Sequence, residues 1–191
     1  MAGNSAQELQ AARARLARFV TGQTAERVFT QPTGHPSGPT GFCYCDGGLH
    51  RALSLYLRAA AWEWVLRLPC NRPRIWYLRR CGVQIGAEVH LSPGVWIDPM
   101  FPRLLTIEER VFVGTGVKIA MHEFRINEFR AGKVLIRPEA VIGAFAVIGC
   151  GVEIGARATV AAGAVVGRDV PPGTTAIGNP ARIIRKQCMP S

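Results

Sequence analysis

The sequence predicts an all-β fold of the parallel β-helix class, built from hexapeptide repeats and preceded by an α-helical extension. From Ile136 onward an aliphatic residue recurs every six positions, and a small or aliphatic residue stands four positions after it, so both lie on one strand face. A Gly or Ala directly after the aliphatic residue favours a tight corner between short strands. The aliphatic positions are Ile136, Ile142, Ile148, Ile154, Val160 and Val166.

Residues 1–80 lack the repeat, and we expect them to form an N-terminal extension. Ala6–Phe19 has the spacing of an amphipathic helix, and the stretch 30–48, rich in Pro and Gly, is typical of a loop. A second helix is expected from Leu49 to Leu68, and its Arg and Glu residues exclude a transmembrane span. This helix either caps the open end of the β-helix and packs on a neighbouring subunit, which we favour, or lies in a membrane interface.

The repeat continues upstream of Ile136 with two interruptions, and the predicted β-helix domain spans residues 81–173. Residues 98–102 form the first interruption. The second, at about 122–133, is polar and charged, so we expect an extruded loop of the kind that often carries binding and catalytic residues. Residues 174–191 are expected to form a tail that contributes to the cofactor site. A sandwich of short strands would also alternate apolar residues, but it does not predict so many units in strict phase.

Composition limits the classes of function. The formal net charge of +10 is carried mostly by arginine, 20 of the 23 basic residues, and suits an anionic partner such as a polyanionic small molecule or a membrane surface. No nucleic-acid motif with stacking aromatics is visible. The first residues show no secretory signal, which favours a cytoplasmic protein with reduced thiols. Cys43 and Cys45, with Asp46 and His50, could hold a metal, but a lone C-x-C pair is a weak signal.

His122 is the candidate catalytic residue. It stands three positions after the aliphatic Ile119, where the extruded loop is expected to begin. A histidine at the edge of a β-helix beside a protruding loop is placed to act as a general base. Imidazole side chains titrate near neutral pH, so the neutral ring can take a proton from a hydroxyl. His90 falls at an outward position and is expected to be solvated.

Three segments carry a resemblance to a known family: IAMHEF at 119–124, IGAFAVIGCGVEIGARATVAAGAVVGRDVPPG at 142–173, and GNPARIIRK at 178–186. Together they resemble the hexapeptide-repeat acyltransferases. They are most similar to the O-acetyltransferases of sugars and surface polysaccharides, the group that contains the galactoside and maltose acetyltransferases. The resemblance covers roughly residues 81–186. It implies a left-handed prism, a homotrimer and acetyl-CoA bound in a groove between two prisms, with no metal.

The resemblance also implies roles for individual residues. His122 matches the histidine that deprotonates the acceptor hydroxyl. The acceptor side departs from the family pattern, since Ser92 and Asp98 stand where acceptor-binding residues are expected, and Glu123 is a third candidate for acceptor binding. Glu123 or Glu128 could orient His122. The matched cofactor positions are Ala144 and Ala162 at the pantetheine arm, Gly167 and Arg168 before DVP, and Arg182 and Arg185 at the phosphates.

The sequence therefore predicts an acetyl-CoA-dependent O-acetyltransferase acting on a hydroxyl of a sugar, a glycan or a similar small acceptor. Three alternatives stay open: a non-catalytic β-helix scaffold, N-acetyl transfer to an amino sugar, and a zinc site like that of the γ-class carbonic anhydrases. The zinc site of that class needs three histidines, and only His90 and His122 fall in the predicted β-helix.

Overall fold

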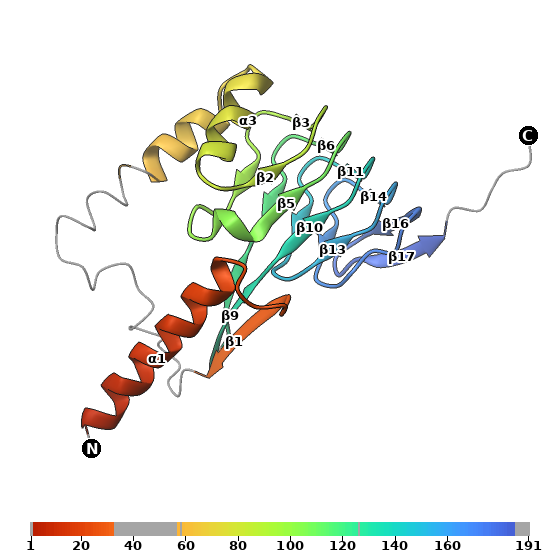
Figure 1. Ribbon diagram of the computed structural model, residues 1–191. Coiled ribbons are helices and arrows are strands. Elements are labelled where there is room, and N and C mark those ends of the chain that lie inside the picture. The colour runs from red at the N-terminus through yellow and green to blue at the C-terminus, as the bar shows by residue number, and fades with distance from the viewer. Residues whose placement is uncertain (1, 33–56, 58, 126, 186–191) are drawn as a thin grey trace, which may run out of the picture.

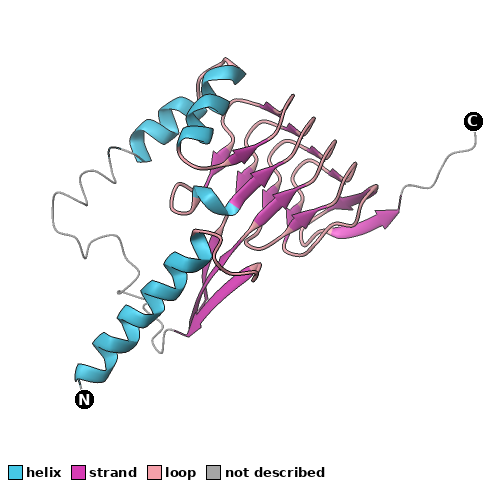
Figure 2. Ribbon diagram, in the orientation of Figure 1, coloured by secondary structure: helices cyan, strands magenta, loops and turns pink. Residues whose placement is uncertain are grey.

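The computed structural model describes residues 2–32, 57, 59–125 and 127–185 (Figures 1 and 2). Helix α1 (Ala2–Val20) and strand β1 (Val28–Pro32) come first, residues 59–66 are helical, and helix α3 (Asn71–Arg80) leads into a stack of short strands. The elements that follow are β2 (Gln84–Ile85), β3 (His90–Leu91), β4 (Trp96–Ile97), the 3₁₀ helix η3 (Pro102–Leu104), β5 (Leu105–Ile107), β6 (Phe112–Val113), β7 (Lys118–Ile119), β8 (His122–Arg125), β9 (Glu128–Gly132), β10 (Val134–Ile136), β11 (Val141–Ile142), β12 (Val147–Ile148), β13 (Glu153–Ile154), β14 (Thr159–Val160), β15 (Val165–Val166), β16 (Thr174–Ile177) and β17 (Arg182–Arg185).

The strands of the stack form parallel sheets that the chain visits in turn. It passes through β2, β3 and β4, then β5, β6 and β7, then β10, β11 and β12, and then β13, β14 and β15, with one strand in each sheet per coil (Figure 1). Equivalent repeat positions pair directly, because Ile107 lies opposite Ile85 and Ile136, and Ile136 lies opposite Ile154. The predicted β-rich architecture of stacked hexapeptide coils with helices before it is confirmed.

The aliphatic repeat positions line the interior of the stack. Ile107, Ile136 and Ile154 are fully buried, and the small partner positions, such as Ala140 and Ala158, are buried with them. Burial of one isoleucine side chain stabilises a fold by about 1.5–3 kcal/mol. A single coil has no other coil to bury this surface against, so the coils are stable only as a stack.

The small residue after the aliphatic position is required for packing at Gly143 and Gly155, and it does not make the turn. Gly143 follows the aliphatic Ile142, and a Cβ at Gly143 would lie 2.5 Å from the backbone nitrogen of Ala162 in the next coil. The turn is made two residues later, where Phe145 has a φ of 60° and its counterpart Gly163 a φ of 69°. At such a corner, the position after the aliphatic residue must be small because the coils approach closely there. The position two residues later must adopt a left-handed backbone conformation.

Segment 122–133 leaves the stack as a β-hairpin, not as the irregular loop that its polarity suggested. Strand β8 pairs antiparallel with β9, and β9 pairs on its other side with β1 (Figure 1). Because β9 is the central strand, its Phe129 and Ala131 are fully buried. Strand β1 occupies the start of the stretch 30–48 predicted to be a loop, and residues 33–48 lie outside the described part. The pairing of β1 with β9 joins the segment before residue 80 to the segment after it. The predicted domain boundary at residue 80 stays a prediction.

Two of the N-terminal helical segments fall where the sequence predicted helices. Helix α1 contains the predicted range 6–19, and its Phe19 is buried against Phe29 of β1, with ring centroids 5.9 Å apart. Residues 59–66 lie inside the predicted helix 49–68, of which residues 49–56 and 58 are outside the described part. No helix among the described residues is both long and apolar enough to cross a bilayer. The cytoplasmic location expected from the sequence stays a prediction.

The sequence analysis missed helix α3, because arginines interrupt its apolar spacing. One of them, Arg74, is buried and donates hydrogen bonds to the carbonyls of Leu68 and Leu91. Burial lowers the pKa of Arg74, since a low-dielectric environment disfavours the charged guanidinium. The spacing of residues along the sequence does not distinguish a buried arginine that donates to backbone carbonyls from an arginine on the surface.

Side chains of the N-terminal segment cover the open edge of the first coil in each sheet. Trp62, Asn71 and Arg79 bond to backbone groups at β4, β3 and β2, respectively. The bonds are Trp62 Nε1 to Ile97 O (2.8 Å), Asn71 Nδ2 to Val89 O (2.8 Å), Leu91 N to Asn71 Oδ1 (3.0 Å), and Arg79 Nη2 to Ile85 O (2.9 Å) and Gly86 O (2.8 Å). Unpaired strand edges invite pairing with other chains, so these bonds protect the end of the stack. Of these residues only Trp62 belongs to the helix expected to cap the stack, and the contact of that helix with a neighbouring subunit or a membrane stays a prediction.

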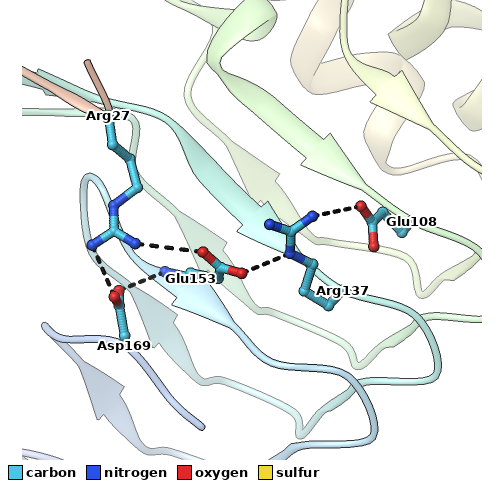
Figure 3. Close-up of polar contacts among 5 residues, drawn as sticks. All are labelled: Arg27, Glu108, Arg137, Glu153 and Asp169. Atoms are coloured by element: carbon cyan, nitrogen blue, oxygen red, sulfur yellow. Dashed lines mark hydrogen bonds and ion pairs between the residues drawn. The ribbon is translucent and has the colours of Figure 1, made fainter. Parts of the chain in front are cut away.

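A row of ion pairs ties the start of β1 to the outside of the stack. Figure 3 shows Arg27 bridging Asp169 (2.8 Å) and Glu153 (3.5 Å), and Arg137 bridging Glu153 (2.7 Å) and Glu108 (2.9 Å). Hydrogen bonds to Glu153 and Glu108 raise the pKa of Arg137. These side chains are 30–47% exposed, so each pair contributes no more than about 1 kcal/mol. The two pairs of Arg27 link the start of β1 to the stack, whereas the two pairs of Arg137 join neighbouring coils within the stack.

Candidate active site

His122 and Asp98 form a pair at one edge of the stack. His122 opens β8, directly after the chain leaves β7, and its Nδ1 is hydrogen-bonded to Oδ2 of Asp98. Asp98 follows β4 and is 1% exposed. Its carboxylate also accepts hydrogen bonds from the backbone N–H of Met100 (2.9 Å) and of Met121 (3.3 Å). The backbone of two successive coils therefore holds the carboxylate in place.

This arrangement sets the orientation of the imidazole. A carboxylate only accepts hydrogen bonds, so Nδ1 of His122 carries the hydrogen and Nε2 keeps its lone pair. An imidazole held in this way can take a proton at Nε2, and the imidazolium that forms is stabilised by the carboxylate behind it. The structure therefore leaves Nε2 of His122 as the ring nitrogen that can accept a proton.

Asp98 was placed on the acceptor side by the sequence, and Glu123 or Glu128 was expected to orient His122. In the structure Asp98 is the partner of His122, whereas Glu123 pairs with Arg130 (2.6 Å) and Arg125, and Glu128 pairs with Arg125. The signal that could have found the partner is the coil register. Ile97 lies opposite Ile119, so the residues that follow them meet at the same edge.

Three phenylalanines surround the ring of His122. Ring centroids lie 5.6 Å away for Phe101, 5.5 Å for Phe124 and 6.1 Å for Phe129. The first two meet the imidazole edge-on, and Phe124 is 49% exposed. The sequence analysis did not name these residues, although all three stand in or beside the two interruptions of the repeat. They give the site an apolar wall that a ligand can reach at Phe124.

Cys150 lies one coil further along this edge, after Gly149 at the end of β12. Burial is the main cause that raises the pKa of its thiol to about 11, with a smaller contribution from Glu123. The thiol therefore stays protonated at neutral pH and is not a thiolate nucleophile beside His122.

The predicted site residues divide between the two edges of the sheet β4–β7–β12–β15. We call the side where the chain enters these strands the upstream edge and the side where it leaves them the downstream edge. Gly167 and Arg168 follow β15 directly, so they stand at the downstream edge, as His122 and Asp98 do. Both Gly167 and Arg168 are exposed.

The upstream edge holds the other group of predicted residues. Ser92, Ala144 and Ala162 stand between a strand of the neighbouring sheet and a strand of this one. Gly163 N donates to Ala144 O across 2.9 Å, so Ala144 and Ala162 belong to adjacent stacked corners. Ser92 is 7% exposed, which leaves little of it open to an acceptor. Within one chain, these positions are not brought together with His122.

The two C-terminal arginines lie on the last strand. β17 pairs antiparallel with β16 at the end of the stack, and places Arg182 opposite Ile177 and Arg185 opposite Thr174. Arg182 is exposed, as a residue that binds phosphate in solution must be. The side chain of Arg185 lies outside the described part of the chain.

The described residues contain no cluster of side chains suited to a metal ion. In that part of the chain, no group of three or more His, Cys, Asp and Glu side chains is placed to hold a metal ion. His90 instead stacks on the ring of Phe112, with centroids 5.1 Å apart. Cys43, Cys45 and His50 of the weak C-x-C signal lie outside the described residues.

Sequence comparison finds relatives among acetyltransferases. A family model described as bacterial transferase hexapeptide (six repeats) matches residues 133–168. An acetyltransferase named YvoF from Bacillus subtilis is 41% identical over 102 residues, which are 53% of this chain and 59% of the relative. A 2,3,4,5-tetrahydropyridine-2,6-dicarboxylate N-acetyltransferase from Staphylococcus aureus is 43% identical over 81 residues, 42% of this chain and 33% of the relative. The chain thus spans 59% and 33% of the length of these two relatives, less than two thirds of either.

Solved structures share the fold. A hexapeptide-repeat acetyltransferase from Vibrio cholerae, complexed with acetyl-CoA, superposes with a TM-score of 0.60 at 24% identity, covering 73% of this chain and 91% of that one. A galactoside acetyltransferase in complex with coenzyme A superposes with a TM-score of 0.56 at 20% identity, covering 73% and 84%. The resemblance to hexapeptide-repeat transferases is confirmed, and at these identities the likeness to the galactoside enzyme is one of fold.

Proposed function

We propose that this protein is an acetyl-CoA-dependent O-acetyltransferase that acts on a hydroxyl of a sugar, a glycan or a similar small acceptor. The observation that carries the proposal is His122, oriented by the buried carboxylate of Asp98 at the edge of a hexapeptide stack. The acetyltransferase relatives and the acetyl-CoA complex of a protein with this fold support acetyl-CoA as the donor. The left-handed sense of the coils, implied by the resemblance, is part of the same proposal.

In the proposed reaction the acceptor hydroxyl donates a hydrogen bond to Nε2 of His122. As the hydroxyl oxygen attacks the thioester carbonyl carbon, its proton moves to Nε2, and the imidazolium is stabilised by Asp98. The C–S bond then breaks, and the departing sulfur takes the proton from the imidazolium. The products are the acetyl ester and free coenzyme A. The apolar wall at Phe101 and Phe124 limits water near the reacting groups.

The position of the donor is proposed by residue. Arg182 and Arg185 bind the phosphates of acetyl-CoA, and Gly167 and Arg168 contact the same cofactor. Its pantetheine arm runs past the upstream corners at Ala144 and Ala162. His122 and these upstream corners stand on opposite edges of one sheet. A groove between two chains, lined by the downstream edge of one and the upstream edge of the next, brings both groups to a single site. In the family that the sequence resembles, such head-to-tail contacts close a ring of three chains, so the proposal includes a homotrimer.

Exposed apolar side chains support assembly. Phe112 and Val141 are neighbours on adjacent coils and are 43% and 41% exposed, and Phe145, at the next corner, is 68% exposed. Contiguous exposed apolar surface of this kind often marks a protein interface. We expect light scattering at micromolar concentration to give a mass about three times the 20.7 kDa of one chain.

An interface variant tests the assembly further. Val141→Asp is expected to dissociate the trimer and to lower activity by about tenfold or more, because a charge would be buried without a partner. The same change at Thr30, an exposed residue of β1, is the control and is expected to leave the mass unchanged. A wild-type protein that is monomeric and fully active would show that the proposal of an active site between two chains is wrong.

The phosphate contacts are tested by charge removal. Arg182→Ala combined with Arg185→Ala is expected to raise KM for acetyl-CoA at least about tenfold, because charge-assisted hydrogen bonds contribute about 1.5–3 kcal/mol each. KM for the acceptor should change little. Arg13→Ala with Arg18→Ala removes the same charge from helix α1 and serves as the control. If both double variants behave alike, the C-terminal arginines do not hold the phosphates.

The reaction itself is tested by thiol release from acetyl-CoA across a panel of sugars, nucleotide sugars and lipid-linked glycans. Treatment of the product with neutral hydroxylamine distinguishes the outcomes, because it cleaves an ester and leaves an amide intact. An amide product would redirect the proposal to N-acetyl transfer, the reaction named for the relative from Staphylococcus aureus. Absence of thiol release with every acceptor, together with no binding of acetyl-CoA, would favour the non-catalytic scaffold.

A further inference from the structure

We propose that residues 57 and 59–80, which we call the helical cap, dock the protein on an anionic phospholipid surface. The chain has four tryptophans, and the cap holds the two that are most exposed, Trp64 at 77% and Trp76 at 64%. Indole rings combine an apolar body with an N–H donor, and they favour the boundary between hydrocarbon and water. Figures 1 and 2 show the cap on the outside of the first coils, at the end of the stack opposite β17.

The first helix of the cap is apolar on two opposite faces. Trp62 and Leu66 are 3% exposed and form the face against the stack. Leu57 and Trp64 are seven residues apart, about two helical turns, so they share the other face, and Leu57 is 63% exposed. The inner face packs on the stack, where Trp62 donates a hydrogen bond to the first coil. No described part of the chain covers the outer face. An uncovered apolar stripe of this kind marks a contact surface.

Helix α3 adds positive charge around the second tryptophan. Arg72, Trp76 and Arg80 follow at intervals of four residues and lie on one side of the helix, opposite the buried Leu78. The guanidinium of Arg80 lies over the ring of Trp76, 6.0 Å from its centroid. Tryptophan at the depth of the acyl boundary with arginine at the phosphates is the arrangement by which interfacial helices bind anionic lipid.

The charges of the chain favour lipid over a second copy as the occupant. Most described carboxylates are already paired within the chain, which leaves little acidic surface to receive the arginines of another cap. The paired carboxylates are Glu63, Asp98, Glu108, Glu109, Glu123, Glu128, Glu139, Glu153 and Asp169. Among the side chains that the structure describes, which exclude those of residues 2–9, the carboxylates outside this set are Glu26 and Glu88. With a net charge of +10, the anion that matches the cap must come from another molecule.

Co-sedimentation of the full chain with vesicles tests the proposal. Vesicles of phosphatidylcholine with phosphatidylglycerol are expected to bind the protein at least about tenfold more tightly than vesicles of phosphatidylcholine alone, and high salt should release it. Tryptophan emission should shift to shorter wavelength on binding. Trp64→Ser with Trp76→Ser, and separately Arg72→Ala with Arg80→Ala, should each weaken binding about tenfold or more.

Controls separate the cap from general charge and from assembly. Arg13→Ala with Arg18→Ala removes two charges elsewhere and should leave vesicle binding nearly unchanged. If that control weakens binding as much as the Arg72 and Arg80 variant, or if neutral vesicles bind equally well, the proposal is overturned. A smaller mass by light scattering for the tryptophan variant, without vesicle binding by the wild type, would assign the surface to contact between copies. Binding of acetyl-CoA, measured by calorimetry, should be the same in all these variants. A failure of the vesicle-binding proposal would therefore not argue against the proposed acetyltransferase function.

Discussion

Replacing His122 with alanine is expected to lower kcat by roughly 10²–10⁴-fold while acetyl-CoA still binds. The imidazole is the group at the downstream edge that can accept the hydroxyl proton, and its removal leaves the acceptor to attack as a neutral alcohol. The residues proposed to bind the phosphates of the donor, Arg182 and Arg185, lie on β17, so we expect donor binding not to depend on the ring. Calorimetry with acetyl-CoA and turnover with the acceptor found in the panel provide the two measurements.

Thr30→Ala is the control, because Thr30 is exposed on β1 and lies outside the stack that carries the proposed interface residues Phe112 and Val141. It is expected to keep turnover within about twofold of wild type, as surface substitutions usually do. Intact donor binding together with wild-type turnover in His122→Ala would show that the general-base proposal is wrong. If Thr30→Ala lost both acetyl-CoA binding and turnover, the measured losses would reflect misfolding and not the removal of a catalytic group.

Asp98→Asn is expected to lower kcat by roughly 10²–10⁴-fold, because the amide removes the charge that stabilises the imidazolium and can favour the wrong tautomer of His122. The side-chain carbonyl of asparagine can still accept from the backbone N–H of Met100, so the local fold is expected to persist. Thermal unfolding of the variant is the check. KM for acetyl-CoA should change little, since Asp98 is buried behind the histidine.

A double variant separates positioning from mere structural support. If Asp98 acts through His122, adding Asp98→Asn to His122→Ala should lower kcat by less than about twofold further, because groups that act as a unit are strongly non-additive. Losses that multiply in the double variant would mean that Asp98 acts independently of the histidine. That result would return Asp98 to the acceptor-binding role suggested by the sequence.

Much of the fold follows from local periodicity. A repeat of six places an aliphatic residue such as Ile136 at the same point of each coil, and pairing between coils then follows from the constant offset. The same periodicity shows where the chain must leave the stack, so it locates His122 and the segment 122–133. It does not show what that segment becomes. The hairpin forms because β1, about a hundred residues earlier, pairs with β9, and the polar alternation of an exposed sheet resembles a loop.

The sequence by itself determined the stacked hexapeptide coils, the α1 helix, the place of His122 and the resemblance to acyltransferases, since each depends on residues close together in the chain. Only the tertiary structure decided that Asp98, 24 residues from His122, orients the ring, and that Glu123 does not. It also decided that Trp62, Asn71 and Arg79 close the open strand edges. The physical reason is that such side chains bond to backbone groups or to charges that the fold brings near them, and spacing along the chain carries no information about that approach.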